Sequence, residues 1–469
     1  MKFGTSGLRG LVSDMTGELV TAYTAAFLRH LETDGAPAEA LLVGRDLRPS
    51  SERIAGEVLA AAEAAGVQGV QCGVLPTPAL ALESAARGLP ALMVTGSHIP
   101  FDYNGLKFYR ATGEITKADE AGITAALADA PTPLPAPVSP AEDDAARRRY
   151  IERITGFFAP DALAGTRIGV YQHSAAGRDV LTEILEGLGA EVIAFGRTDG
   201  FIPIDTEAVR PEDEALAREK TASERLDAMV STDGDGDRPL MADEAGTILR
   251  GDILGVLTAQ FLGADAVATP ISSNTALERT GAFAHIARTR IGSPYVIAAM
   301  EELEAAGARL VVGFEANGGF LLGGDVTNEG GAVLSALPTR DAVVPLLATL
   351  VAAKTRGLRV SELVASLPAR YTASDRLKEI GQDRSGPLLA GLAAEETARR
   401  DFLSGLGLAP AGEPDTSDGV RMGLEGDEIL HLRPSGNAPE LRCYAEAASP
   451  ERARDLVART LEKVAAELR

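Results

Sequence analysis

One short pattern occurs three times in this chain and limits the architectures open to it. A helix end, a glycine and an apolar run follow one another in EAAGVQGVQCGV from Glu63, EGLGAEVIAFGR from Glu186 and EAAGARLVVGFE from Glu304. Each glycine stands where the end of a helix needs a left-handed residue, and each Val- or Ile-rich run is typical of a buried strand. The three copies start 123 and 118 residues apart. This spacing predicts three related α/β domains rather than a short-period repeat.

The rest of the sequence predicts a fourth domain. A chain of 469 residues is too long for one ordinary hydrophobic core. Five prolines between Pro131 and Pro140 predict an extended linker, and residues 339–354 are interpreted as a helix. Near Leu367 the pattern changes to a smaller tail, which ends in a helix capped by Ser449. We expect α/β domains with mixed sheets at residues 1–140, 141–250 and 251–366, and a smaller C-terminal α+β domain at residues 367–469.

The charge of the chain excludes some classes of partner. A formal net charge of −22 and a pI near 4.8 argue against nucleic acid and anionic membranes. A phosphate-bearing substrate would therefore need a local cluster of cations. The first ten residues contain no apolar signal segment, and the longest uncharged apolar stretch, residues 342–353, is too short to span a bilayer. With Cys72 and Cys443 in separate apolar runs, interpreted as core residues, the chain is expected to be cytoplasmic.

A first candidate site lies in PALMVTGSHIPFDYNGLKFY, residues 90–109. The apolar strand ALMVT leads directly into a loop with Ser97 and His98, and NGLKFY is interpreted as a turn into a second strand that carries Lys107. A serine hydroxyl at a strand end can carry a phosphoryl group if a base removes its proton and cations cover the phosphate. On this motif alone an ordinary turn remains the alternative.

A second candidate site lies in LDAMVSTDGDGDRPLM, residues 226–241. Asp233, Asp235 and Asp237 alternate in a loop after an apolar strand, so their carboxylates are predicted to converge. Three converging carboxylates suit Mg²⁺ and its preference for oxygen ligands. A calcium EF-hand is excluded because Arg238 stands where that loop needs glycine and a strand precedes it. A solvated acidic turn and a phosphatase with an aspartyl nucleophile stay open.

Three further segments offer groups that bind sugars or phosphates. In LVVGFEANGGFLLGG, Glu315 and Asn317 stand on a turn and could bond vicinal hydroxyls, although Asn-Gly hairpins are common. In EILHLRPSGNAPELRCYAE, residues 433–437 lie between two strands and offer donors for a phosphate, or form a plain β-turn. The N-terminal segment FGTSGLRG is expected to bring Arg9 in on a flexible, glycine-rich approach.

In this order, the segments resemble the α-D-phosphohexomutase family of phosphomannomutases, phosphoglucomutases and phosphoglucosamine mutases. TGSHIP is similar to its phosphoserine loop, DGDGDR to its metal loop, GFEANGG to its sugar-specificity loop and RPSGNAPE to its phosphate-binding loop. The resemblance covers the whole chain and implies four domains around a central cleft. It also implies an isomerase that interconverts hexose 1- and 6-phosphates through a phosphoserine and a hexose 1,6-bisphosphate, which would serve as activator. Mg²⁺ is the implied cofactor and a small phosphosugar the implied partner, with a monomer or a homodimer equally open.

The resemblance also implies a role for each matching residue. The catalytic group would be Ser97, Arg9, His98 and Lys107, with Lys107 and Arg9 as the candidates for handling the hydroxyl proton. The Mg²⁺ ligands would be Asp233, Asp235, Asp237 and a phosphate oxygen on Ser97. The substrate would be bound by Arg238, Arg290 in TRIGSPYV, Glu315, Asn317, Arg433, Ser435, Gly436 and Asn437.

The sequence departs from the family at three positions. Ile99 stands where many members carry Asn, and Asn437 stands where Thr is frequent in the family. Gly319 stands where many members carry a histidine in the sugar loop. Gly319 cannot make an imidazole contact, so the preferred sugar is open. We expect mannose or glucose phosphate rather than glucosamine phosphate. The first alternative is a phosphoglucosamine mutase, followed by a metal-dependent sugar-phosphate phosphatase and a non-catalytic sugar-phosphate sensor.

Overall fold

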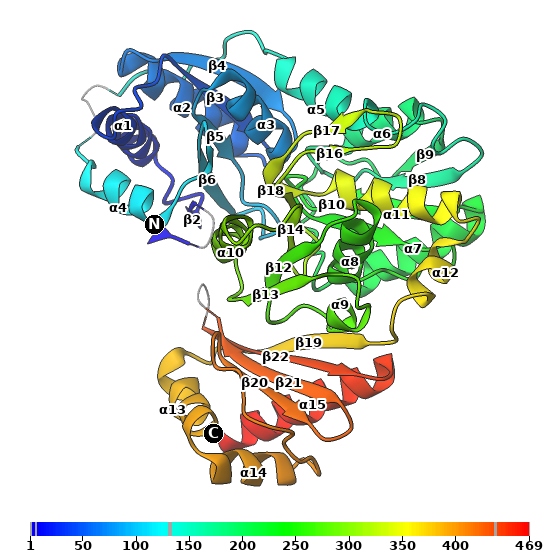
Figure 1. The fold of residues 1–469 in the computed structure, drawn as a ribbon. Helices are drawn as coiled ribbons and strands as arrows, with labels where there is room; N and C mark the ends of the chain where they lie inside the picture. The colour runs from blue at the N-terminus through cyan, green and yellow to red at the C-terminus, as the bar shows by residue number, and fades with distance from the viewer. Residues whose placement is uncertain (1, 5–6, 130–133, 436–438, 469) are drawn as a thin grey trace.

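The computed structural model describes residues 2–4, 7–129, 134–435 and 439–468, and these form four domains (Figure 1). Domain I is built on a sheet of order β1-β2-β6-β5-β3-β4, with β7 paired to β6. Its strands are β1 (Lys2–Phe3), β2 (Leu8–Leu11), β3 (Ala40–Arg45), β4 (Gln68–Val74), β5 (Ala91–Val94), β6 (Tyr103–Arg110) and β7 (Gly113–Glu114). Its helices are α1 (Gly17–Thr33), α2 (Ser51–Ala64), α3 (Thr77–Arg87) and α4 (Lys117–Ala125).

Domains II and III repeat the central part of this sheet. Domain II has the order β11-β10-β8-β9 and domain III the order β13-β12-β14-β15-β18. The strands of domain II are β8 (Arg167–Tyr171), β9 (Glu191–Phe195), β10 (Ala228–Thr232) and β11 (Pro239–Ala242), and its helices are α5 (Ala145–Thr155), α6 (Arg178–Gly187) and α7 (Pro211–Glu224). The sheet of domain III has β12 (Ala266–Pro270), β13 (His285–Thr289), β14 (Val311–Phe314), β15 (Phe320–Leu322) and β18 (Leu337–Asp341), beside a ribbon of β16 (Val326–Thr327) and β17 (Val333–Leu334). Its helices are α8 (Gly251–Phe261), α9 (Ala276–Arg279), α10 (Ser293–Ala305), α11 (Val343–Thr355) and α12 (Val360–Ala365).

The three sheets share one connection pattern. In each, the first strand pairs in parallel with the second and the third, and the third pairs antiparallel with the fourth: β3, β4, β5 and β6, then β8, β9, β10 and β11, then β12, β13, β14 and β15. The prediction of three similar α/β domains with mixed sheets is therefore confirmed.

Domain IV is the smaller α+β domain, seen at the bottom of Figure 1. Its antiparallel sheet has the order β19-β22-β21-β20. The elements are β19 (Tyr371–Lys378), α13 (Gln382–Ala394), α14 (Glu396–Ser404), β20 (Val420–Leu424), β21 (Glu428–Pro434), β22 (Glu440–Ala447) and α15 (Pro450–Glu467). As predicted, the Ser449 side chain caps α15, accepting a hydrogen bond from the backbone N–H of Arg452.

Domains I to III share a buried core, and domain IV has its own. One hydrophobic cluster includes Met93 of β5, Val230 of β10 and Val312 of β14. A separate cluster fills the space between the sheet of domain IV and its helices. Domain IV meets domain III through polar contacts such as the Glu446 carboxylate, which accepts from the backbone N–H of Thr275 at 3.0 Å. None of the helices in the described ranges has the length and apolar run that a bilayer crossing needs.

The threefold pattern has the predicted local geometry but is out of register in its third copy. Gly66, Gly189 and Gly307 follow α2, α6 and α10 with φ of +79°, +86° and +92°. The first two copies lead into β4 and β9, which are edge strands and half exposed, so the prediction of buried strands is wrong there. The third leads into β14, a buried inner strand that corresponds to β5 and β10. The counterpart of β4 and β9 is β13.

Two other local predictions are wrong. Asn104 and Gly105 do not form a turn but lie within β6, opposite β2. A Cβ on Gly105 would lie 2.6 Å from the Leu8 carbonyl oxygen, so the glycine serves a close strand approach. Residues 339–341 belong to β18 and not to the following helix α11.

Candidate active site

The candidate residues of domains I to III lie on equivalent loops. Residues 95–102, 233–238 and 315–319 each connect the third strand of a sheet to its antiparallel fourth strand. Two of these loops meet directly, because the Ser97 hydroxyl donates to Asp233 Oδ2 at 2.8 Å. The third is joined to the second through Arg340, as described below. The serine and metal motifs, which are 136 positions apart, thus form one site.

Ser97 is held in a strained, buried conformation. Its φ is +54°, a left-handed value that a non-glycine residue adopts only when its surroundings impose it. The side chain is almost inaccessible, at 1% exposure, and the backbone N–H donates to Thr95 Oγ1 at 2.8 Å. The hydroxyl is therefore aimed at the aspartates by the loop rather than free to rotate into solvent.

Arg48 organises the Ser97 loop, and the sequence analysis missed it. This side chain is fully buried and forms an ion pair with Asp46, with Nε 3.2 Å from Oδ2. Its guanidinium donates to the backbone carbonyls of Ser97 (2.7 Å), Ile99 (2.6 Å), Pro100 (2.5 Å) and Tyr103 (2.9 Å). A planar fork of donors suits this task. A charged Asp-x-Arg directly after a buried strand was the available signal.

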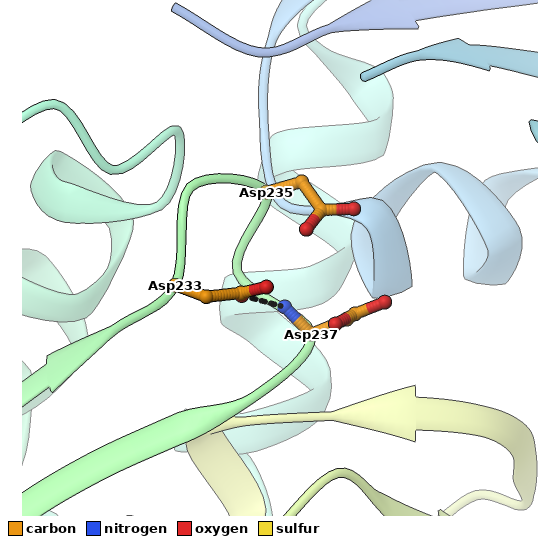
Figure 2. Close-up of side chains that lie close together, drawn as sticks. All are labelled: Asp233, Asp235 and Asp237. Carbon is orange, nitrogen blue, oxygen red and sulfur yellow. Dashed lines mark hydrogen bonds between the residues drawn. The ribbon is translucent and has the colours of Figure 1, made fainter. Parts of the chain in front are cut away.

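Asp233, Asp235 and Asp237 converge as predicted (Figure 2). One oxygen from each lies within 4.8 Å of the others, and all three side chains are buried. The loop is closed by the Asp237 N–H, which donates to Asp233 Oδ1 at 3.2 Å. Oδ1 of Asp235 and of Asp237 are buried and have no hydrogen-bond partner among the described residues. Free carboxylate oxygens in a buried cluster fit a hard divalent cation.

Lys107 neutralises part of this negative charge. Its Nζ lies 2.6 Å from Asp235 Oδ2 and 2.7 Å from Asp237 Oδ2. Burial alone would raise the pKa of Asp235, but the Lys107 ammonium outweighs it and the pKa is lowered. Burial and the two neighbouring carboxylates raise the pKa of Asp233 well above its usual range. Ionisation of Asp233 is thus disfavoured by its neighbours, and a divalent cation bound among the three carboxylates would relieve that repulsion.

His98, Arg238 and Arg9 surround the serine with donors. His98 Nδ1 lies 2.9 Å from Arg238 Nη1 and 3.3 Å from the Ser97 hydroxyl oxygen. Arginine can only donate, so Nδ1 accepts and the imidazole is neutral. Burial and the charges of Arg238 and Arg9 accordingly lower the pKa of His98 well below its usual range. Nε of Arg9 and Nε of Arg238 are buried without a partner in the described chain, as donors awaiting an anion would be.

The prediction that Arg9 reaches the site on a flexible segment is wrong. It lies in β2, which is paired with β1 and β6, so its position is set by the sheet. Burial and the nearby charges of Arg238 and Arg340 lower the pKa of Arg9 to about 10.

The sugar-loop residues are tied to the metal loop by Arg340, which the sequence analysis also missed. Glu315 Oε2 lies 3.1 Å from Arg340 Nη1 and 3.4 Å from Asn317 Nδ2. Arg340 Nη2 lies 3.0 Å from Asp237 Oδ2. The structure therefore brings Glu315 and Asn317 into the same cluster as the aspartates.

Arg433 and Arg290 form a second group, where domains III and IV meet. The Asp418 carboxylate accepts from Arg433 Nε at 2.8 Å and from the Ile291 N–H at 2.9 Å. Arg290 is exposed, and its Nε donates to the Ser417 carbonyl at 2.8 Å. Arg290 thus adjoins the loop that holds Arg433.

The predicted phosphate loop begins at the end of β21 with Ser435. This residue is buried, and its N–H donates to the Glu440 carbonyl at 2.8 Å across the hairpin formed by β21 and β22. Gly436 and Asn437, the other two candidates of this loop, lie outside the described residues.

Comparison with known proteins explains this arrangement. Models of the phosphoglucomutase/phosphomannomutase alpha/beta/alpha domains I, II and III match residues 1–132, 148–246 and 250–371, and the model of its C-terminal domain matches residues 358–463. A phosphomannomutase of Salmonella muenchen is 48% identical, over 100% of this chain and 96% of its own. One of Sinorhizobium fredii is 47% identical, over 98% of each chain. The chain belongs to the phosphoglucomutase/phosphomannomutase family.

As a member of this family the chain is a phosphohexose mutase, which is an isomerase. The family is magnesium-dependent, and the aspartate triplet fits such a site. A phosphoglucomutase/phosphomannomutase family protein of Burkholderia thailandensis shares the fold, with a TM-score of 0.76 at 21% identity over 98% of this chain and 97% of its own.

Proposed function

We propose that this mutase interconverts mannose 1-phosphate and mannose 6-phosphate, with Ser97 as the phosphoryl carrier and with glucose phosphates as possible second substrates. Two relatives above 45% identity are phosphomannomutases, which supports mannose. The observation that carries the phosphoserine role is the 2.8 Å contact between the Ser97 hydroxyl and Asp233, at a buried triplet with two unpaired oxygens. A serine that served only a turn would not need this buried carboxylate cluster beside its hydroxyl.

In the proposed reaction, the phosphoryl group leaves Ser97 Oγ for the free hydroxyl oxygen of the hexose phosphate. The proton of that hydroxyl passes through a neighbouring side chain to Ser97 Oγ, so that the serine ends as a neutral alcohol. Asp233, Asp235, Asp237 and a phosphate oxygen on Ser97 would hold Mg²⁺, which supplies charge neutralisation at the transferring group. The N–H donors of the Arg9, Arg238 and His98 side chains would bind the other phosphate oxygens. Of the two candidates for the hydroxyl proton, Arg9 has the lowered pKa, and Lys107 is committed to two carboxylates.

The bisphosphate formed in this step would turn end for end and return its other phosphate to Ser97. Glu315 and Asn317 would bond the sugar hydroxyls in both orientations. Arg433, Ser435, Gly436 and Asn437, with Arg290 beside them, would bind the phosphate that is not reacting. Hexose 1,6-bisphosphate would load Ser97 and so act as activator. A variant N-acetylphosphoglucosamine mutase of Aspergillus fumigatus, which shares the fold at 16% identity and a TM-score of 0.61, has been crystallised with glucose 1,6-bisphosphate.

We also propose the cytoplasm as the place of action. The two cysteines, Cys72 and Cys443, are both buried and free. Unpaired thiols are usual in a reducing compartment.

The proposal is tested by mass spectrometry and a coupled assay on the full chain. Intact mass and peptide analysis should find one phosphate on Ser97, and Ser97→Ala should lose it together with mutase activity. Ser84→Ala is the matched control. Ser84 is as buried as Ser97, but its hydroxyl donates to the Leu89 carbonyl just after the end of α3, away from the site.

The same assay compares mannose 1-phosphate, glucose 1-phosphate and glucosamine 1-phosphate. The highest kcat/KM is expected with mannose 1-phosphate, and activity should rise on pre-incubation with a hexose 1,6-bisphosphate. Normal turnover by Ser97→Ala, or release of inorganic phosphate in place of the isomer, would show that the proposed function is wrong.

A further inference from the structure

We infer that Arg340 is a positioning residue for sugar binding, and that Gly319 is glycine because only a hydrogen leaves room for the Arg340 side chain. The inference rests on the proposed mutase function and deepens it. It concerns the metal loop (residues 233–238) and the sugar loop (residues 315–319), which come from different domains.

Arg340 bridges these two loops with one planar group. Nη2 lies 3.0 Å from Asp237 Oδ2, and Nη1 lies 3.1 Å from Glu315 Oε2. The Arg340 side chain is only 4% exposed, so both contacts are shielded from water. A fork of fixed donors can serve two carboxylates at once, whereas a lysine ammonium is a single point of charge. This side chain therefore couples the carboxylate of Glu315 in the sugar loop to that of Asp237 in the metal loop.

The space for Arg340 is provided by Gly319. A Cβ at residue 319 would lie 2.7 Å from Arg340 Cδ, 2.8 Å from Cγ and 3.1 Å from Cβ. These atoms are close to the backbone of Arg340, so they cannot swing away as the tip of a flexible side chain could. Gly319 is not among the glycines with a positive φ, so its backbone would accept alanine without strain. The three atoms nearest to such a Cβ all belong to Arg340, which is therefore the side chain that a larger residue would displace.

This arrangement accounts for the departure seen in the sequence. Where many family members carry a histidine in the sugar loop, this chain has Gly319, and the volume beside it is filled by an arginine from β18. Arg340 engages Oε2 of Glu315, and the structure records no hydrogen bond to Oε1 from any described residue. The second oxygen is thus held ready for a sugar hydroxyl.

A double-mutant cycle tests the inference, with Gly319→Ala, Arg340→Ala and the double variant. Gly319→Ala keeps every charge and should raise the KM for mannose 1-phosphate at least about tenfold, the loss expected for one charge-assisted hydrogen bond, while kcat falls less than about threefold. In the Arg340→Ala background, the same glycine substitution should change KM by less than about twofold, because its clashing partner is gone. Arg340→Lys should not restore the wild-type KM.

Binding is measured separately from turnover. Calorimetry with mannose 1-phosphate, on Ser97→Ala proteins that also carry each substitution, should show the same pattern in Kd. Arg153→Ala is the matched control, because Arg153 is another buried arginine that joins two domains. Its Nη1 lies 3.3 Å from Oδ2 of Asp341, the residue that follows Arg340. It should lower the melting temperature and leave KM unchanged.

The outcomes separate this inference from the proposed function. A wild-type enzyme without mutase activity would refute the function, whatever the cycle shows. An active wild-type enzyme whose KM is unaffected by Gly319→Ala, or whose two substitutions are additive, would refute the role of Arg340 and leave the function intact. A wild-type KM in the Arg340→Lys enzyme would refute the requirement for a planar group that binds both carboxylates.

Discussion

Replacing Arg48 with methionine should unlock the Ser97 loop and destabilise domain I. The substitution removes the donors of four backbone carbonyls and leaves the Asp46 carboxylate buried without its cation. Breaking a buried ion pair on one side costs about 3–5 kcal/mol. Burial already raises the pKa of Asp46, so a lone carboxylate there should protonate more readily still.

Hydrogen exchange is the suitable assay, because a chain of four domains does not unfold in one step. Amides of β3 and α2 report the opening of domain I, and about 3–5 kcal/mol corresponds to roughly 10²- to 10⁴-fold faster exchange. Peptides that cover residues 96–103 should lose protection first, since the N–H groups of Ile99 and Tyr103 bond within the loop. Mutase activity should fall with them.

Two controls sharpen this test. Arg53→Met removes a side chain that is 42% exposed and pairs with Glu57 on the same helix, so it should change stability by less than about 1 kcal/mol. Asp46→Asn combined with Arg48→Met removes the lone buried charge and should recover part of the lost protection. Exchange in Arg48→Met within about threefold of the wild type would refute the reasoning.

Three other expectations concern stability, metal and substrate. Burial raises the pKa of Asp119. Hydrogen bonds from His30 and Thr116 and the charge of Arg110 together outweigh this effect and lower the pKa of Asp119 to about 2. Its stabilisation is thus present above the unfolded pKa of about 3.9 and lost as the pH falls through about 2. Asp119→Asn should therefore lower the opening free energy of domain I by roughly 1–2 kcal/mol at pH 6, after allowing for solvent screening, and by little at pH 2, as measured by hydrogen exchange of the α4 amides. Asp235→Asn should weaken Mg²⁺ binding in calorimetry at least about 100-fold, and an unchanged Kd would contradict the metal site. Arg433→Ala should raise KM about tenfold or more, because its guanidinium would bind the non-reacting phosphate, and should lower the melting temperature only modestly, because the Arg433–Asp418 pair is partly open to solvent; an unchanged KM would contradict the phosphate role.

The candidate loops could be predicted because their signals are local. An apolar run of four or five residues followed by glycine and polar residues marks a strand that ends at a functional loop. The Ser97 and aspartate loops obey this rule, and the structure places both directly after buried strands.

Arg48 and Arg340 could not be predicted in the same way. Each acts on groups distant along the chain, Arg48 on carbonyls about fifty positions away and Arg340 on Asp237. The Asp-x-Arg after β3 hints at a buried ion pair for Arg48 but not at the loop that it binds, and nothing in the neighbourhood of Arg340 marks that residue. The helix expected from residue 339 failed for a related reason: the segment continues smoothly into the apolar run of α11, and only pairing with β15 makes residues 339–341 a strand.

The error in the register of the internal repeat shows which sequence feature marks the same position in each of the three domains. A helix followed by glycine and an apolar strand describes every helix-to-strand step of such a sheet, so the third copy could match the wrong step without any local inconsistency. The loop between the third and fourth strands occurs once in each domain, at the point where the sheet changes from parallel to antiparallel. In domain I this loop carries Ser97, in domain II the aspartates and in domain III Glu315. Because the loop has the same place in each sheet, domains packed on one shared core could direct all three into a single site, and each was then free to acquire a different chemical role.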